Sequence, residues 1–174
     1  MALTADMQIA TERRWLAAHT RSRHENQVAS QLGRKGVEAL LPTYEKFTRW
    51  TDRIRRARAP LFPGYVFVRV SEAERLPVLQ TSGVVNLVSF AGRPAPLRDE
   101  EVERLRVCGV QGSEVEPHPF LRAGQRVRVK HGPFAGWEGV LVHKQNAARL
   151  IVNVEQISRS IAINIHGADV EPLA

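Results

Sequence analysis

The sequence predicts an α+β domain, a sheet with helices packed against it, followed by a small all-β barrel. The first part of the chain alternates short apolar runs with helical patterns, an order typical of α+β folds. Residues 125–173 instead hold short runs rich in Val and Ile, separated by glycine turns, which is typical of a small barrel. Between them, 111–120 mixes Gly, Ser, Glu and Pro without periodicity. The predicted domains are therefore 1–110 and 121–174, joined by a linker at 111–120.

Each element of the first domain follows from its local pattern. The apolar run in RWLAAHT predicts a buried strand, and the helical spacing in RHENQVASQL predicts a helix after it. Residues 37–50 are typical of a strand broken at Pro42, and the alternation in YVFVRV gives the clearest strand of the chain. A short helix before Gly83, a strand through Val88 and a helix opened by the acids of RDEEVERL complete the domain.

Composition narrows the class of partner. The 174 residues carry a net charge of +7, which favours nucleic acid or an acidic protein surface over anionic small molecules alone. No apolar stretch approaches the roughly 20 residues of a membrane span, and the first residues lack a signal-peptide pattern. We therefore expect a cytoplasmic, monomeric protein with no membrane partner.

The sequence offers little for catalysis. The single Cys108 excludes an intrachain disulfide and a thiolate zinc cluster, and we expect it to be a small, buried or half-buried apolar residue. No phosphate-binding glycine loop, catalytic triad context or metal-ligand spacing is found. We expect no enzyme activity, no cofactor and no metal.

The segment PLFPGYVFV sets a Pro63-Gly64 step between aromatic residues at the start of a strand. Because glycine adopts torsion angles closed to other residues, the step allows a sharp turn that presents Phe62 and Tyr65 together. Phe67 lies two residues beyond Tyr65, on the same face of the strand. The three rings are a candidate anchor for a protein partner; alternatively, they fill the core between sheet and helices.

Basic side chains gather at the first strand-helix junction and in the run KFTRWTDRIRRARAP. Both sets could follow a phosphate backbone, and Trp50 could stack on a base. The alternatives are a solvated hairpin tip and a helix start that orders basic side chains without a ligand. The candidate nucleic-acid-binding residues are Arg21, Arg23 and His24, and Arg53, Arg55, Arg56 and Arg58.

Four segments together resemble the NusG family of transcription elongation factors: RWLAAHTRSRHE, PLFPGYVFV, TSGVVNLVSFAGRPAPL and GQRVRVKHGPFAGWEGV. The resemblance covers nearly the whole chain. It implies an antiparallel NusG-like N-terminal (NGN) domain and a KOW domain, which is an SH3-like barrel. It also implies a non-catalytic elongation or antitermination factor that binds RNA polymerase through the first domain and recruits other factors through the barrel. The segment HTRSRHE is similar to specialised paralogues such as RfaH and the UpxY group.

The resemblance implies roles for residues of the first domain. The positions of Phe62, Tyr65 and Phe67, with His19 on the first strand, dock on the clamp helices of RNA polymerase in the family. Arg21 matches a position near the non-template DNA strand in specialised paralogues. The alternative function is that of a KOW-containing RNA-binding protein of the translation apparatus, for which the aromatic segment would have no evident use.

The resemblance also implies a partner site in the barrel. Phe134 lies in the glycine-rich turn HGPFAGWEG and matches the KOW-loop residue that the family uses against a small-subunit ribosomal protein or the termination factor Rho. Trp137 of the same turn is expected to pack against the barrel. Ile157, in the opposite loop, is expected to be a second exposed apolar contact. The β-branched residues of RLIVNVEQISRSIAINI favour strands over a helical form of this segment.

Overall fold

The computed structural model describes residues 12–50, 53–108, 115–118, 124–144, 147–165 and 169–173. These residues belong to two compact units. The first unit draws on Met1–Pro42 and Phe62–Glu103, and the second on Thr43–Leu61 and Arg104–Ala174. The domain boundaries expected from the sequence, 1–110 and 121–174, stay a prediction.

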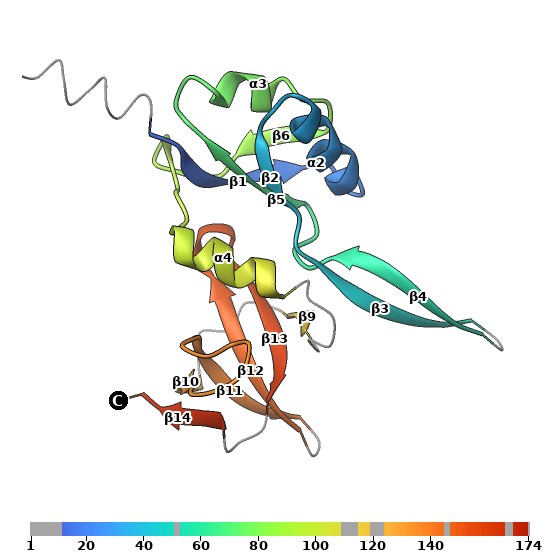
Figure 1. The fold of residues 1–174 in the computed structure, drawn as a ribbon, viewed down its shortest axis with the longest axis vertical. Helices are drawn as coiled ribbons and strands as arrows, with labels where there is room; N and C mark the ends of the chain where they lie inside the picture. The colour runs from blue at the N-terminus through green and yellow to red at the C-terminus, as the bar shows by residue number, and fades with distance from the viewer. Residues whose placement is uncertain are drawn as a thin grey trace, which may run out of the picture. The chain divides into compact units, whose positions relative to one another are not determined.

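An antiparallel sheet of four strands forms the centre of the first unit, in the order β2-β5-β1-β6 (Figure 1). The central pair β1 and β5 runs in register from Arg14 opposite Val70 to His19 opposite Tyr65. This confirms the strands expected in RWLAAHT and YVFVRV. The four strands are β1 (Arg14–Thr20), β2 (Glu38–Leu40), β5 (Tyr65–Val70) and β6 (Val84–Leu87).

Two helices, α2 (Glu25–Arg34) and α3 (Arg75–Leu79), pack on one face of this sheet. Val28 and Leu32 are four residues apart, so they lie on the same side of α2 and both reach the core. Full burial of such a side chain stabilises the fold by about 1.5–3 kcal/mol. The core cluster consists of Leu16, Ala18, Val28, Leu32, Val66, Val68, Val70, Val78 and Leu87.

The opposite face of β1 and β5 is buried as well. It carries Trp15, Ala17 and Phe67, which are all buried. The chain that leads into α4 (Asp99–Val107) is tied to this region, because the N–H of Leu97 donates to the carbonyl oxygen of Trp15 at 2.9 Å. In the middle of these strands, side chains on both faces are therefore buried, which agrees with the apolar residues found on both faces there.

The helix α4 begins as its acidic residues predict. Asp99, Glu100 and Glu101 occupy its first turn, where the helix dipole favours negative charge. The Glu101 carboxylate also accepts the backbone N–H of Arg98 at 3.0 Å, which is one half of a capping box. Cys108, just beyond the helix, is buried as expected, and burial raises the pKa of its thiol to about 12.

Two hairpins complete the part of the fold before α4. A long two-stranded ribbon is formed by β3 (Thr43–Trp50) and β4 (Arg53–Pro60), in register from Thr43 opposite Pro60 to Trp50 opposite Arg53 (Figure 1). Because Pro42 lies between β2 and β3, the predicted break at this proline is confirmed. A much smaller hairpin, β7 (Ser89–Phe90) with β8 (Arg93–Pro94), follows β6.

The second unit holds an antiparallel sheet of six strands in the order β14-β10-β11-β12-β13-β9. Buried β-branched and leucine side chains line it, among them Val127, Leu150, Ile161 and Ile163. The strands are β9 (Val115–His118), β10 (Gln125–Val129), β11 (Glu138–Lys144), β12 (Ala147–Val154), β13 (Arg159–Ile165) and β14 (Val170–Pro172), with a 3-10 turn at Glu155–Ile157.

The strand β9 comes from the segment expected to be a linker. It pairs with β13 from Val115 opposite Ile163 to His118 opposite Ser160, and the Val115 side chain is buried. This pairing gives backbone N–H and C=O groups of the segment hydrogen-bond partners in β13. In a linker these groups would be hydrogen-bonded to water. The other residues of 111–120 lie outside the described part of the chain.

The predicted fold class is confirmed: a mixed α+β part with antiparallel strands and packed helices, and an all-β part after it. The described residues between 125 and 165 are in strands and turns, as their β-branched composition predicts. Among the residues that the structure describes, no helix is long and apolar enough to cross a membrane.

Candidate functional site

The turn between β4 and β5 is fixed by two hydrogen bonds, one to the end of β1 and one to the start of α2. The N–H of Thr20 donates to the carbonyl oxygen of Gly64 at 2.8 Å. The N–H of Gly64 donates in turn to Oε1 of Glu25 at 2.7 Å, and the Glu25 side chain is buried. Gly64 has φ = 85°, a left-handed conformation that favours glycine. The Pro63-Gly64 step therefore has a defined shape and a fixed position.

This arrangement brings His19 and Tyr65 together. They are register partners on β1 and β5, their ring centroids are 5.3 Å apart, and both side chains are half-buried. Two of the four residues predicted to contact a polymerase thus form one partly exposed pair of rings. We call this pair, with the junction residues Arg21, Arg23 and His24, the corner of the first unit.

The structure corrects the expected patch of three exposed aromatic rings. Phe62 and Phe67 are 1% and 0% exposed, and their rings meet edge to face with centroids 5.7 Å apart. The alternation along β5 does place Phe67 on the same face as Tyr65, but Phe67 is buried there, whereas Tyr65 at the start of the strand is half-buried. Phe62 and Phe67 belong to the core beneath the corner.

The basic residues of the corner lie on the short turn between β1 and α2. Arg21 and Arg23 are exposed, and the Arg21 N–H donates to the carbonyl oxygen of Gly83 at 2.8 Å, which holds the turn in place. Arg23 has φ = 65°, an uncommon conformation for a residue with a side chain. His24 is half-buried, with Nδ1 2.9 Å from the carbonyl oxygen of Ser22.

The second basic set is exposed on the β3–β4 hairpin: Arg53, Arg55, Arg56 and Arg58. Because side chains alternate along a strand, Arg53 and Arg55 lie on one face of the ribbon and Arg56 and Arg58 on the other. At the base of the hairpin, burial and the negative charge of Glu116 raise the pKa of Tyr44. The side chain of Trp50, expected to stack on a base, lies outside the described part of the structure.

The two residues expected to be exposed in the second unit are buried instead. Phe134 is 7% exposed because its ring packs edge to face on Trp137, with centroids 5.2 Å apart. Ile157 is 5% exposed in the turn between β12 and β13. Trp137 is buried, so its expected packing is confirmed. The glycine-rich turn folds its aromatic residue inward.

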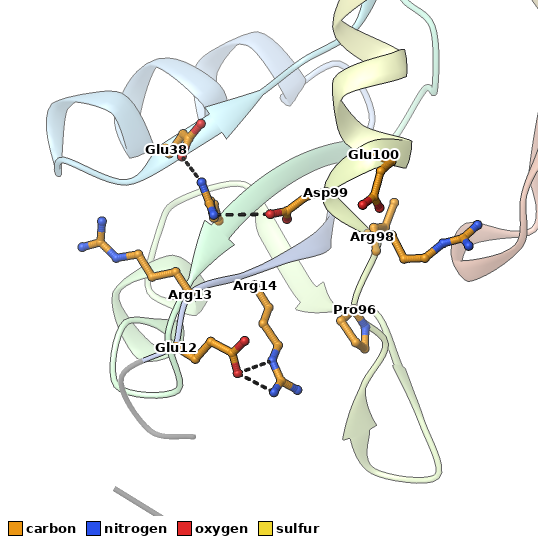
Figure 2. Close-up of a pocket in the computed structure, with 10 residues that line it drawn as sticks. Glu12, Arg13, Arg14, Glu38, Pro96, Arg98, Asp99 and Glu100 are labelled. Atoms are coloured by element: carbon orange, nitrogen blue, oxygen red, sulfur yellow. Dashed lines mark hydrogen bonds and ion pairs between the residues drawn. The ribbon is translucent and has the colours of Figure 1, made fainter. Parts of the chain in front are cut away.

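An open pocket on the first unit is lined by charged residues that pair with one another. Figure 2 shows Glu12 against Arg14, and a guanidinium between Glu38 and Asp99. That guanidinium is Arg69, whose nitrogens lie 3.8 Å from the Glu38 carboxylate and 3.5 Å from the Asp99 carboxylate. These pairs tie the start of α4 to the sheet, so the pocket has a structural role.

Comparison with known proteins places the chain in a family. Residues 13–106, which span β1 to α4, match the family described as "Transcription termination factor nusG". The chain belongs to the NusG family. Over 173 residues it is 30% identical to the transcription termination/antitermination protein NusG of Pseudomonas aeruginosa, covering 91% of this chain and 98% of that protein. The NusG of Deinococcus radiodurans is 32% identical over 182 residues, covering 89% of this chain and 92% of the relative.

A solved structure supports the same fold for this NusG-family chain. The structure described as "Domain interaction in Thermotoga maritima NusG" aligns with a TM-score of 0.61 and 23% identity. The alignment covers 94% of this chain and 98% of the other. It shows that the NusG fold extends over both units.

Sequence reasoning missed one residue that holds the corner in place. Glu25 stands in the first turn of α2, where an acidic residue is explained by the helix dipole alone. Its buried side chain links the start of α2 to the turn at Gly64, which is 39 residues away in sequence. No local pattern connects the two positions.

Proposed function

We propose that this protein is a cytoplasmic transcription elongation and antitermination factor that binds RNA polymerase through the corner of its first unit. It acts by binding and carries out no catalysis. The clamp helices of the polymerase are the proposed docking site, with His19 and Tyr65 as the contacting rings. A specialised role, similar to that of RfaH or the UpxY group, stays a prediction.

The observation that carries this proposal is the fixed position of the His19–Tyr65 pair. Partly exposed rings on rigid elements make good interface anchors, because little conformational entropy is lost when they bind. The Glu25–Gly64 bond and the Thr20–Gly64 bond hold the turn beside these rings. Phe62 and Phe67 contribute by supporting the corner from below.

Replacing Tyr65 by alanine should weaken binding to core RNA polymerase by about 1–3 kcal/mol, the cost of removing an interface anchor. Biolayer interferometry with purified core enzyme would measure the change. Tyr44→Ala, which truncates the chain's other tyrosine, is the matched control and should leave the affinity unchanged. Unchanged affinity of Tyr65→Ala, with a normal circular dichroism spectrum, would show that the corner is not the docking site.

The exposed arginines suggest that nucleic acid is contacted during elongation, with the non-template DNA strand as the candidate near Arg21. Replacing Arg53, Arg55, Arg56 and Arg58 with glutamine should make binding to an elongation complex less dependent on salt. Each phosphate of duplex DNA that the variant no longer neutralises reduces the slope of log K against log salt by about 0.9. If the slope measured between low and moderate salt stays the same, the hairpin is merely solvated.

A partner of the second unit, either a small-subunit ribosomal protein or Rho, is also proposed from the family resemblance. Its expected contacts, Phe134 and Ile157, are buried in this structure. Binding through these side chains would therefore require the turns at Gly132–Trp137 and Glu155–Ile157 to open. Other residues of these turns can make the contact without such a change.

A further inference from the structure

One face of the β3–β4 hairpin carries apolar side chains in water. Phe47 is 59% exposed and Ile54 is 71% exposed. In the ribbon register Phe47 lies opposite Arg56, and Ile54 is two residues before Arg56, so Phe47 and Ile54 are diagonal neighbours on the same face. The Arg56 guanidinium carbon lies over the Phe47 ring, 5.5 Å from its centroid.

This combination of groups suits a flat, apolar and negatively charged ligand. A phenyl ring with a guanidinium over it is a stacking surface, and the cation also attracts phosphate. On the other face of the ribbon the exposed Lys46, Arg53 and Arg55 supply further positive charge. The acidic Glu45 stands opposite Arg58 and offsets only one of these positive charges, so the hairpin remains strongly basic.

Nucleic acid is the polymer that joins flat apolar groups to a chain of negative charges. In a duplex the faces of the bases are covered by their neighbours, whereas the bases of a single strand can stack on an aromatic side chain. We propose that Phe47, Ile54 and Arg56 form a stacking site for unpaired bases of single-stranded nucleic acid. This inference rests on the proposed contact between the hairpin arginines and nucleic acid, and adds the class of ligand and the residues that recognise it.

The test compares single strands with and without bases. Fluorescence anisotropy measures binding of the full-length protein to a labelled 12-residue oligo(dT) and to an abasic strand with the same phosphates. Phe47→Leu keeps an apolar side chain but removes the ring, and should weaken binding to oligo(dT) by roughly five- to 100-fold. Phe47→Tyr keeps the ring and should stay within about twofold of the wild type.

The abasic strand should bind the wild type weakly, and Phe47→Leu should weaken that binding no further. The matched control is Phe90→Leu. Phe90 is 65% exposed and stands opposite Arg93 in the β7–β8 hairpin, so it is an exposed phenyl ring beside an arginine on a different hairpin. Its replacement should leave binding to both strands unchanged.

An oligo(U) of the same length tests whether the site also binds RNA, since only the ribose carries the 2′-hydroxyl.

Three results would overturn the stacking site. If the wild type binds base-bearing and abasic strands equally and with the same salt dependence, the hairpin contacts phosphate only, and the proposed nucleic-acid contact survives. If neither strand binds, both that contact and the stacking site are wrong. If Phe47→Leu weakens binding to a duplex as much as to a single strand, the ring acts on paired bases. Polymerase affinity, measured separately, is independent of all three.

Discussion

Replacing Phe67 by alanine is expected to lower the free energy of unfolding of the first unit by about 3–5 kcal/mol. The Phe67 ring is fully buried against Phe62, and its removal would leave a cavity beside the central strands β1 and β5. A destabilisation of that size is a large part of the stability of a small domain. Weaker polymerase binding by this variant would therefore reflect unfolding and not the removal of a docking residue.

Hydrogen exchange followed by mass spectrometry would measure the effect strand by strand. Amides of β1 and β5 should exchange faster in Phe67→Ala, while those of β12 and β13, which pair with each other, should keep their wild-type rates. Tyr65→Ala is the matched variant two residues away, and its half-buried ring should cost much less. Equal protection in wild type and Phe67→Ala would mean that the ring is exposed in solution, as the anchor interpretation of the sequence requires.

Replacing Gly139 by alanine is expected to destabilise the six-stranded sheet by about 3 kcal/mol. A Cβ atom at this position would overlap the carbonyl oxygen of Ile151 and lie 3.0 Å from its carbonyl carbon. Both atoms belong to the backbone of β12, which pairs with β11, so they cannot move away without breaking that pairing. The sheet would have to separate at its middle to admit the methyl group.

Thermal and urea unfolding followed by circular dichroism in the strand region would report this destabilisation. Gly33→Ala is the matched control, because nothing lies within 4 Å of the added Cβ and the position is inside α2. Alanine favours a helix over glycine by up to about 1 kcal/mol, so this variant should be as stable as the wild type or slightly more stable. A Gly139→Ala protein that unfolds like the wild type would contradict the close strand packing.

Local pattern was sufficient for most of the secondary structure. The alternation in YVFVRV, the helical spacing of Val28 and Leu32, and the acids at the start of α4 each act within a few residues, and each element is found where expected. The corner was partly predictable for the same reason. The Pro63-Gly64 turn and the strand positions of His19 and Tyr65 follow from their immediate neighbours.

Exposure could not be predicted from the same patterns. Phe67 and Tyr65 share a face of β5, but only Phe67 is buried, with its ring against Phe62, and the alternation along the strand does not distinguish the two positions. The Phe134 ring packs against Trp137 and is buried. The glycine-rich turn by itself does not determine whether this ring points inward or into solvent. Glu25 and Gly64 meet through tertiary structure, so composition at either position gives no sign of the other.

The pairing of β9 with β13 affects how the C-terminal part of the protein can be isolated. A fragment beginning at residue 121 would lack β9. The β13 backbone from Ser160 to Ile163 would then have no paired strand on the side away from β12. Unpaired strand edges rich in isoleucine invite self-association. With β9 present, the outer strand contains Pro117, which has no N–H to offer a further strand. A soluble fragment should therefore start before Val115, so that β9 covers the edge of β13 and prevents self-association of the fragment.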